Sequence, residues 1–88
     1  MNLEIKKNLR RAAKFYTDRW RYDRRIRWFA KVDGRWLPMT PFYKSVAGLE
    51  HCNTYRAQGA LEVLGVRVHR FGPAASRRLQ RRLRLAMA

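Results

Sequence analysis

The chain has 88 residues and a formal net charge of +15, from 21 lysine and arginine residues against 6 aspartate and glutamate residues. This length allows one compact domain, which excludes a multidomain enzyme and a transmembrane pore. The charge predicts a polyanionic or acidic partner, while 47% hydrophobic residues, with 3 Trp, 4 Tyr and 4 Phe, argue against a disordered basic tail.

The first predicted element is a helix over residues 3–24. Asn2 is a candidate N-cap, and Glu4 in the first turn suits the helix dipole. Apolar residues recur at spacings of three and four, which places them on one helix face: Ile5, Leu9, Ala12, Ala13, Tyr16 and Trp20. The segment is basic and amphipathic like a mitochondrial transit peptide, but its three acidic residues and single threonine indicate mature structure.

A β-hairpin is predicted next. Residues 25–32 alternate between apolar and polar, and Asp33-Gly34 is typical of a two-residue type I′ turn, whose central residues both need φ > 0. Pro38 lacks an N–H group, which predicts that the second strand lies at a sheet edge.

The turn also predicts which side chains share a face, because cross-strand partners lie on the same side of a sheet. A two-residue loop pairs Val32 with Arg35, Lys31 with Trp36, Ala30 with Leu37 and Trp28 with Met39. The apolar face therefore takes Trp28, Ala30, Leu37 and Met39. Phe29 and Trp36 fall on the opposite face, beside Arg27 and Lys31. Single-stranded RNA is held where cations track phosphates and rings stack on bases, so Phe29 and Trp36 are the candidate base-stacking residues.

The second half of the chain reads as loop, helix, strand and helix. Residues 40–53 are expected to be an irregular loop with one helical turn, because Thr40-Pro41 breaks the pattern. A helix over 55–64 follows, capped by Asn53 or Thr54 and ended by Gly65.

A strand over 66–71 and a last helix from Gly72-Pro73 to about residue 87 complete the chain, since proline is favoured at the first helical position. The expected fold class is α+β, a small single domain with the order α-β-β-α-β-α and basic N- and C-terminal helical arms. Its parts are a basic amphipathic helix (1–24), a small α+β core with the Asp33-Gly34 hairpin (25–71) and an arginine-rich helix (72–88).

Charge is concentrated at the two ends. Residues 1–35 carry a net +8, residues 36–76 a net +2 and residues 77–88 a net +5. Arginine outnumbers lysine 16 to 5, and arginine binds phosphates bidentately and stacks on bases. The candidate RNA-binding residues are Arg10, Arg11, Arg21, Arg24, Arg25, Arg27, Arg35, Arg77, Arg78, Arg81, Arg82 and Arg84.

No pattern in the chain indicates catalysis. His51, Cys52 and Asn53 are residue types of a thiol-hydrolase site, but consecutive side chains point apart and cannot form a triad. These residues and a distant His69 are too few for a metal site. We therefore expect neither an enzyme nor a cofactor, metal or small-molecule substrate. The longest apolar run is far shorter than the roughly 20 residues that span a bilayer.

The short, very basic chain resembles small ribosomal proteins in composition. The expected function is structural: a ribosomal or mitochondrial-ribosomal subunit that binds rRNA and neighbouring proteins of a large particle. Cys52 is the only cysteine, which fits the reducing mitochondrial matrix or cytoplasm. Two alternatives stay open, a DNA-binding accessory module of a phage or mobile element and an accessory subunit of an inner-membrane complex.

Overall fold

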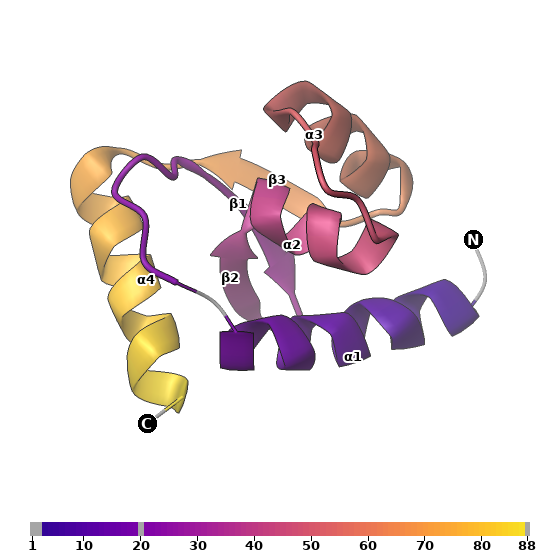
Figure 1. Cartoon of the computed structure of the whole chain (residues 1–88), viewed down its shortest axis with the longest axis horizontal. Coiled ribbons are helices and arrows are strands. Elements are labelled where there is room, and N and C mark those ends of the chain that lie inside the picture. Colours follow the sequence, from indigo (N-terminus) through magenta and orange to yellow (C-terminus); the bar gives the residue numbers. More distant parts are fainter. Residues whose placement is uncertain (1–2, 20, 88) are drawn as a thin grey trace.

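The computed structural model describes the backbone of residues 3–19 and 21–87, and the side chains of residues 7–17 and 21–85. Four helices and three strands follow one another (Figure 1): α1 (Leu3–Arg19), β1 (Trp28–Val32), β2 (Arg35–Pro38), α2 (Met39–Ala47), α3 (Thr54–Val63), β3 (Arg67–Arg70) and α4 (Pro73–Met87). The predicted small α+β domain and its α-β-β-α-β-α order are confirmed, and α2 is an additional helix.

The sheet is antiparallel, with the strand order β2-β1-β3. The predicted hairpin register is confirmed from Val32 opposite Arg35 to Ala30 opposite Leu37. Asp33 and Gly34 adopt φ angles of 53° and 79°, as the type I′ turn requires. β2 is an edge strand, as Pro38 predicts.

The core lies mainly between the sheet and the helices α1, α2 and α3. Tyr16 on α1 meets Phe42 on α2 edge-to-face, with ring centroids 6.4 Å apart. Burial raises the pKa of the Tyr16 hydroxyl above its ordinary value, because the phenolate would be poorly solvated there. The buried cluster draws on every element except β3: Leu9, Ala13, Tyr16, Ala30, Val32, Leu37, Met39, Phe42, Ala57, Leu61 and Leu83.

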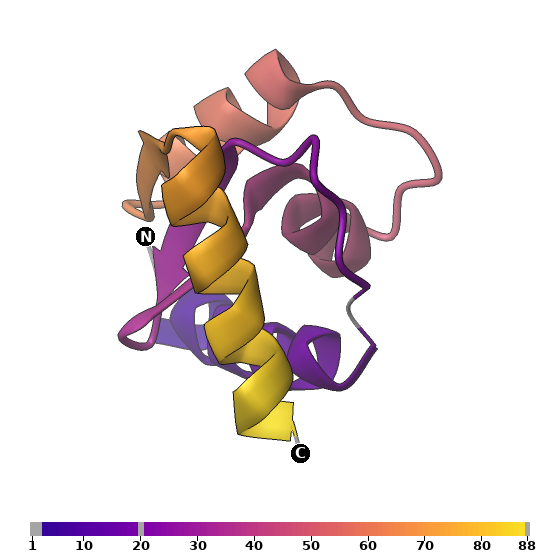
Figure 2. The ribbon, with the colours of Figure 1, turned by 90° about the vertical axis from the view of Figure 1, so that its left-hand side faces the viewer.

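Helix α4 runs beside β2 and reaches α1 near the C-terminal end of both helices (Figures 1 and 2). Its residues Ser76, Gln80 and Leu83 are buried, although the helix is rich in arginine. Both basic helices of the chain therefore contribute side chains to the interior, and the cations among their described side chains are exposed.

The prediction of an irregular loop over 40–53 is wrong for its first half, because residues 39–47 form α2. Pro41 does not break this helix, since it lies in the first turn, where a backbone N–H would have no partner within the helix. Met39 and Phe42 are fully buried and anchor the helix on the core. Met39 consequently does not extend β2, so the predicted pair with Trp28 does not form.

Helix α1 ends at Arg19, earlier than the predicted residue 24. The side chain of Asp23 accepts the backbone N–H of Arg25 (2.9 Å). The side chain of the buried Gln80 accepts the backbone N–H of Asp23 and donates to its backbone carbonyl. These bonds use groups that a longer helix would need. The predicted cap Asn2 and the apolar Trp20 lie outside the described residues.

Helix α3 begins and ends as predicted, within one residue. The Asn53 side chain accepts the backbone N–H of Arg56 (2.8 Å), and Gly65 adopts a φ of 79° after the helix. Among the helices of residues 3–19 and 21–87, none is both long and apolar enough to cross a membrane.

Candidate nucleic-acid interface

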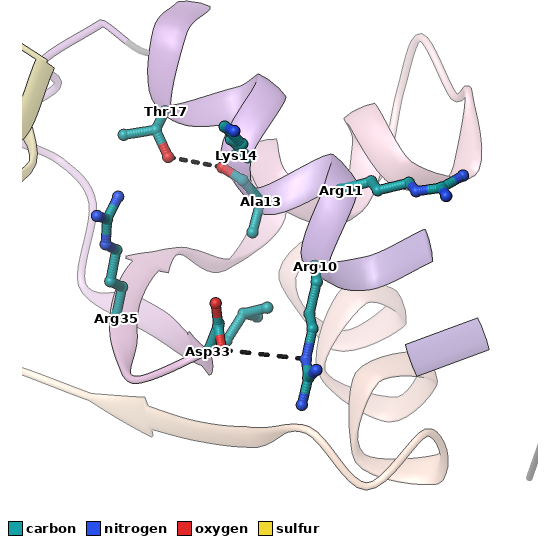
Figure 3. A pocket seen from close by; sticks show the side chains of 8 residues that line it. Arg10, Arg11, Ala13, Lys14, Thr17, Asp33 and Arg35 are labelled. Atoms are coloured by element: carbon teal, nitrogen blue, oxygen red, sulfur yellow. Dashed lines mark hydrogen bonds and ion pairs between the residues drawn. The ribbon is translucent and has the colours of Figure 1, made fainter. Parts of the chain in front are cut away.

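The first concentration of charge lies between α1 and the hairpin. Arg10 and Lys14 are four residues apart, so they project from neighbouring turns of α1. The Asp33-Gly34 turn brings Arg35 on β2 to the same place. Together they line a pocket of about 570 Å³ (Figure 3), which is completed by Arg11, Ala13, Thr17, Val32 and Asp33.

Asp33 is the only carboxylate among these lining residues. It lies 3.9 Å from Nε of Arg10, and both side chains are 69% exposed, so the pair is weak. Figure 3 shows Arg10 directed toward Asp33 and Arg11 extending away from them. The pocket therefore keeps a net positive charge, which suits an anionic group such as a phosphate.

The second concentration of charge lies on α4, which carries no acidic residue. Arg77, Arg81 and Arg84 fall on one face and line a hollow with Tyr22. Arg82 lines another hollow, together with Arg35, Trp36 and neighbouring residues of α4 and the turn. Arg78 is exposed.

Arg35 belongs to both the α1 pocket and the hollow of Arg82. The charges of the two ends of the chain, 47 residues apart at Arg35 and Arg82, thus adjoin in space. We call the surface formed by Arg10, Arg11, Lys14, Arg35 and Arg82, which line these two adjoining hollows, the basic surface. Arg77, Arg81 and Arg84 line the separate hollow of Tyr22 on another face of α4, and Arg78 is exposed on the same helix. Among the described side chains, only Arg10 and Arg25 form an ion pair with a carboxylate.

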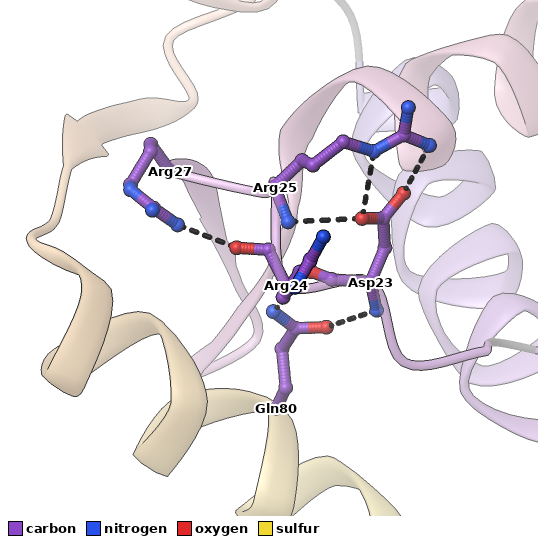
Figure 4. A network of polar contacts seen from close by, with 5 residues as sticks. All are labelled: Asp23, Arg24, Arg25, Arg27 and Gln80. Carbon is purple, nitrogen blue, oxygen red and sulfur yellow. Dashed lines mark hydrogen bonds and ion pairs between the residues drawn. The ribbon is translucent and has the colours of Figure 1, made fainter.

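The four predicted arginines of the segment between α1 and β1 divide into two kinds. Arg21 and Arg24 are exposed, and neither belongs to an ion pair among the described side chains. Figure 4 shows Arg25 binding Asp23 through Nε and Nη2 (3.1 and 2.9 Å) and Arg27 donating to the backbone carbonyl of Arg24. Arg27 also donates to the backbone carbonyl of Ile26. Arg25 and Arg27 thus act first as structural residues of this segment.

Figure 4 also shows how this segment is fixed to α4. Gln80 accepts the N–H of Asp23 (3.0 Å) and donates to the carbonyl of Asp23 (2.9 Å). The hydrogen bonds from Arg25 hold the pKa of the Asp23 carboxyl below its ordinary value, and the carboxylate in turn raises the pKa of Arg25. The positions of Arg21 and Arg24 relative to α4 therefore depend on a polar clamp.

The two predicted stacking residues have different environments. Phe29 is fully buried and meets Phe71 edge-to-face at 5.5 Å, so it cannot present its ring to a base, and its prediction is corrected. The alternation of the strand residues placed Phe29 on a charged face. This pattern carries no information on the packing of α4 and Phe71 against part of that face. Trp36 is half-buried and lies near Lys31, Arg67, His69 and Phe71.

Lys14, Arg67, His69 and Phe71 were not identified as site residues from the sequence. The alternation of residues 67, 69 and 71 in the predicted strand indicates that they share one face of a sheet. The sequence does not show that this strand pairs with β1, and this pairing is what brings the three residues near Trp36. The Cys52 thiol donates to the backbone carbonyl of Asn53 (3.3 Å), whose side chain caps α3. Among the described residues, no group of three or more His, Cys, Asp and Glu side chains could hold a metal ion.

Comparisons with protein-family models, curated proteins and solved structures gave no match for this chain.

Proposed function

We propose that this protein binds folded RNA as a structural subunit of a ribonucleoprotein particle, with the basic surface facing the phosphates. The observation that carries the proposal is the junction of α1, β2 and α4 at Arg35, which joins cations from both ends of the chain. Arginines without a carboxylate partner lose little free energy on leaving water when a phosphate takes the place of that water. Their guanidinium groups bind the phosphate oxygens bidentately.

The small size of the domain supports a structural role in a particle. A domain of this length is only marginally stable by itself, and its like charges repel one another. A polyanion that binds only the folded state stabilises it, and the stabilisation grows with the affinity and with the concentration of the polyanion. The partner we propose is rRNA of a ribosome, in the mitochondrial matrix or the cytoplasm.

Neighbouring proteins of the particle form the second class of partner. Helix α3 leaves Tyr55 and Val63 about 85% exposed, on the part of the fold that carries little charge. Large exposed apolar side chains of this kind are typical of protein contacts. We therefore assign α3 to protein contacts and the basic surface to RNA.

The test compares two double variants with equal loss of charge. Arg35→Gln/Arg82→Gln removes two cations of the basic surface, and Arg56→Gln/Arg70→Gln removes two exposed cations elsewhere. Affinity for a folded RNA is measured by fluorescence anisotropy between about 50 and 200 mM salt. The first variant should reduce the slope of log K against log salt by about 1.4–1.8, from 0.7–0.9 per phosphate contact, and the second by much less.

Equal effects of the two variants would refute the assignment of the basic surface, and binding that is independent of salt would refute RNA binding through phosphates. A duplex DNA with the same number of phosphates serves as competitor. Preference for this DNA would favour a DNA-binding accessory module. Binding to vesicles of anionic lipid, with no binding to RNA, would favour a subunit of an inner-membrane complex.

A further inference from the structure

The face of the sheet that carries Phe29 remains open on the side of β3. Two overlapping registers place Trp36, Lys31 and Arg67 opposite one another in one row across the three strands. Lys31, Arg67 and His69 are exposed on this face, whereas the β2 side is contacted by α4. The row thus brings an aromatic ring and two cations from three separate strands to one open surface.

The rings on this face support one another. Trp36 belongs to β2, yet its ring centroid lies 5.1 Å from Phe71 and 6.4 Å from His69, both beyond the central strand. Its indole therefore extends across β1 toward β3. Phe71 also meets His69 at 4.7 Å and the buried Phe29 at 5.5 Å, each edge-to-face. Phe29 fixes the cluster from below, and His69 and Trp36 form its accessible part.

Two cations flank the Trp36 ring. Nζ of Lys31 lies 5.6 Å and Cζ of Arg67 lies 5.9 Å from its centroid. Neither side chain forms an ion pair with any described carboxylate. Exposed cation–π contacts at this distance are weak, so both cations can turn toward a phosphate when a strand binds.

We propose that Trp36 and His69, flanked by Lys31 and Arg67, bind an unpaired stretch of RNA by stacking on one or two bases. The proposal rests on the proposed function and adds to it a single-stranded site beside the phosphate-binding surface. The two sites adjoin, because Trp36 lines the same hollow as Arg35 and Arg82. A strand whose phosphates contact Arg35 and Arg82 can thus continue onto the rings.

The chemistry of the platform favours bases over an acidic peptide. A peptide carboxylate would use the cations and leave the rings unused, whereas a nucleotide uses both, with its base on a ring and its phosphate on a cation. A base stacked on an aromatic side chain raises affinity by about 5- to 140-fold. Phosphates alone would not distinguish paired from unpaired RNA to this extent.

The experiment measures affinity for two RNAs with the same number of phosphates, a single-stranded oligonucleotide and a fully paired, blunt-ended duplex. Trp36→Leu should weaken single-strand binding about tenfold and duplex binding less than about twofold. Trp36→Phe, which keeps a ring, should restore most of the loss. Tyr55→Leu, on the exposed face of α3, is the matched control and should leave both affinities unchanged.

Because Trp36 is half-buried, thermal melting verifies that its variants fold, and His69→Ala gives an independent variant at an exposed position. His69→Ala should also weaken single-strand binding selectively, and the imidazole resonances of His69 should shift when the oligonucleotide is added. Equal losses for both RNAs, or no loss, would overturn the platform while RNA binding itself stands. Failure of the unaltered protein to bind either RNA would overturn the proposed function instead.

Discussion

Gln80 is the side chain on which the join between α4 and the segment before β1 most depends. It is fully buried, accepts from and donates to the backbone of Asp23, and also donates to Oγ of Ser76 (3.0 Å). Gln80→Met keeps the length and volume of the side chain and removes every hydrogen bond. We expect this substitution to destabilise the protein while α4 remains helical.

The magnitude follows from the two backbone groups of Asp23 that Gln80 binds. The N–H of Asp23 would lose its partner, and its carbonyl would lose one of two hydrogen bonds and keep the one from the N–H of Ile26 (3.2 Å). An unsatisfied, partly buried N–H costs about 1–2 kcal/mol and the lost bond to the carbonyl about 1 kcal/mol, so the total is about 2–3 kcal/mol. For a domain of this size, that loss lowers the melting temperature by roughly 10–20 °C. It is a large fraction of the stability of a small domain, which is about 5–15 kcal/mol.

Circular dichroism melts at matched concentration and low salt measure this change. Gln58→Met on α3 is the control, because Gln58 hydrogen-bonds only to the neighbouring Glu62 (3.2 Å) and should change the melting temperature little. Amide exchange adds a local readout, since the N–H of Asp23 should lose its protection. If Gln80→Met melts within about 3 °C of the unaltered protein, the clamp does not stabilise the fold as argued.

Three further substitutions test other parts of the structure. Phe29→Ala should lower the free energy of unfolding, measured in urea, by about 3–5 kcal/mol, because the ring is fully buried. A decrease below about 1 kcal/mol would contradict the place of this ring in the interior. Gly34→Ala should cost about 1–2 kcal/mol from its φ of 79° alone, since a Cβ there meets no atom within 4 Å, and an unchanged melting temperature would argue against the turn. Asp23→Asn should reduce the acid sensitivity of folding. The lowered pKa of Asp23 stabilises the fold above the ordinary carboxyl pKa of about 4 and this contribution disappears as the pH falls; identical pH–stability profiles of the variant and the unaltered protein would refute this.

The hairpin and the C-terminal helices were predictable because their signals are local. Asp33-Gly34 determines a turn and therefore a register, and Asn53 and Gly65 bound α3 by capping. The end of α1 was not predictable in this way. Its position depends on Gln80, 57 residues from Asp23 in the chain, and no local pattern reports a bond of that span.

The candidate site divides along the same line. Helical spacing predicted the exposed arginines of α1 and α4, but not that Arg35 would join them, which requires the packing of both helices around the hairpin. Alternation correctly placed Phe29 and Trp36 on one face, yet it carries no information on what covers that face. Phe29 lies under Phe71, and Trp36 reaches residues of β3, because β3 pairs with β1.

Sedimentation of the tagged protein from its native cells tests RNA binding in a particle most directly. The protein should migrate with a large RNA-containing particle and move to the light fractions after ribonuclease treatment, whereas deoxyribonuclease should have no effect. Arg35→Gln/Arg82→Gln should migrate in the light fractions without any nuclease. A protein that stays with its particle after ribonuclease, or leaves it only with deoxyribonuclease or detergent, would contradict the account.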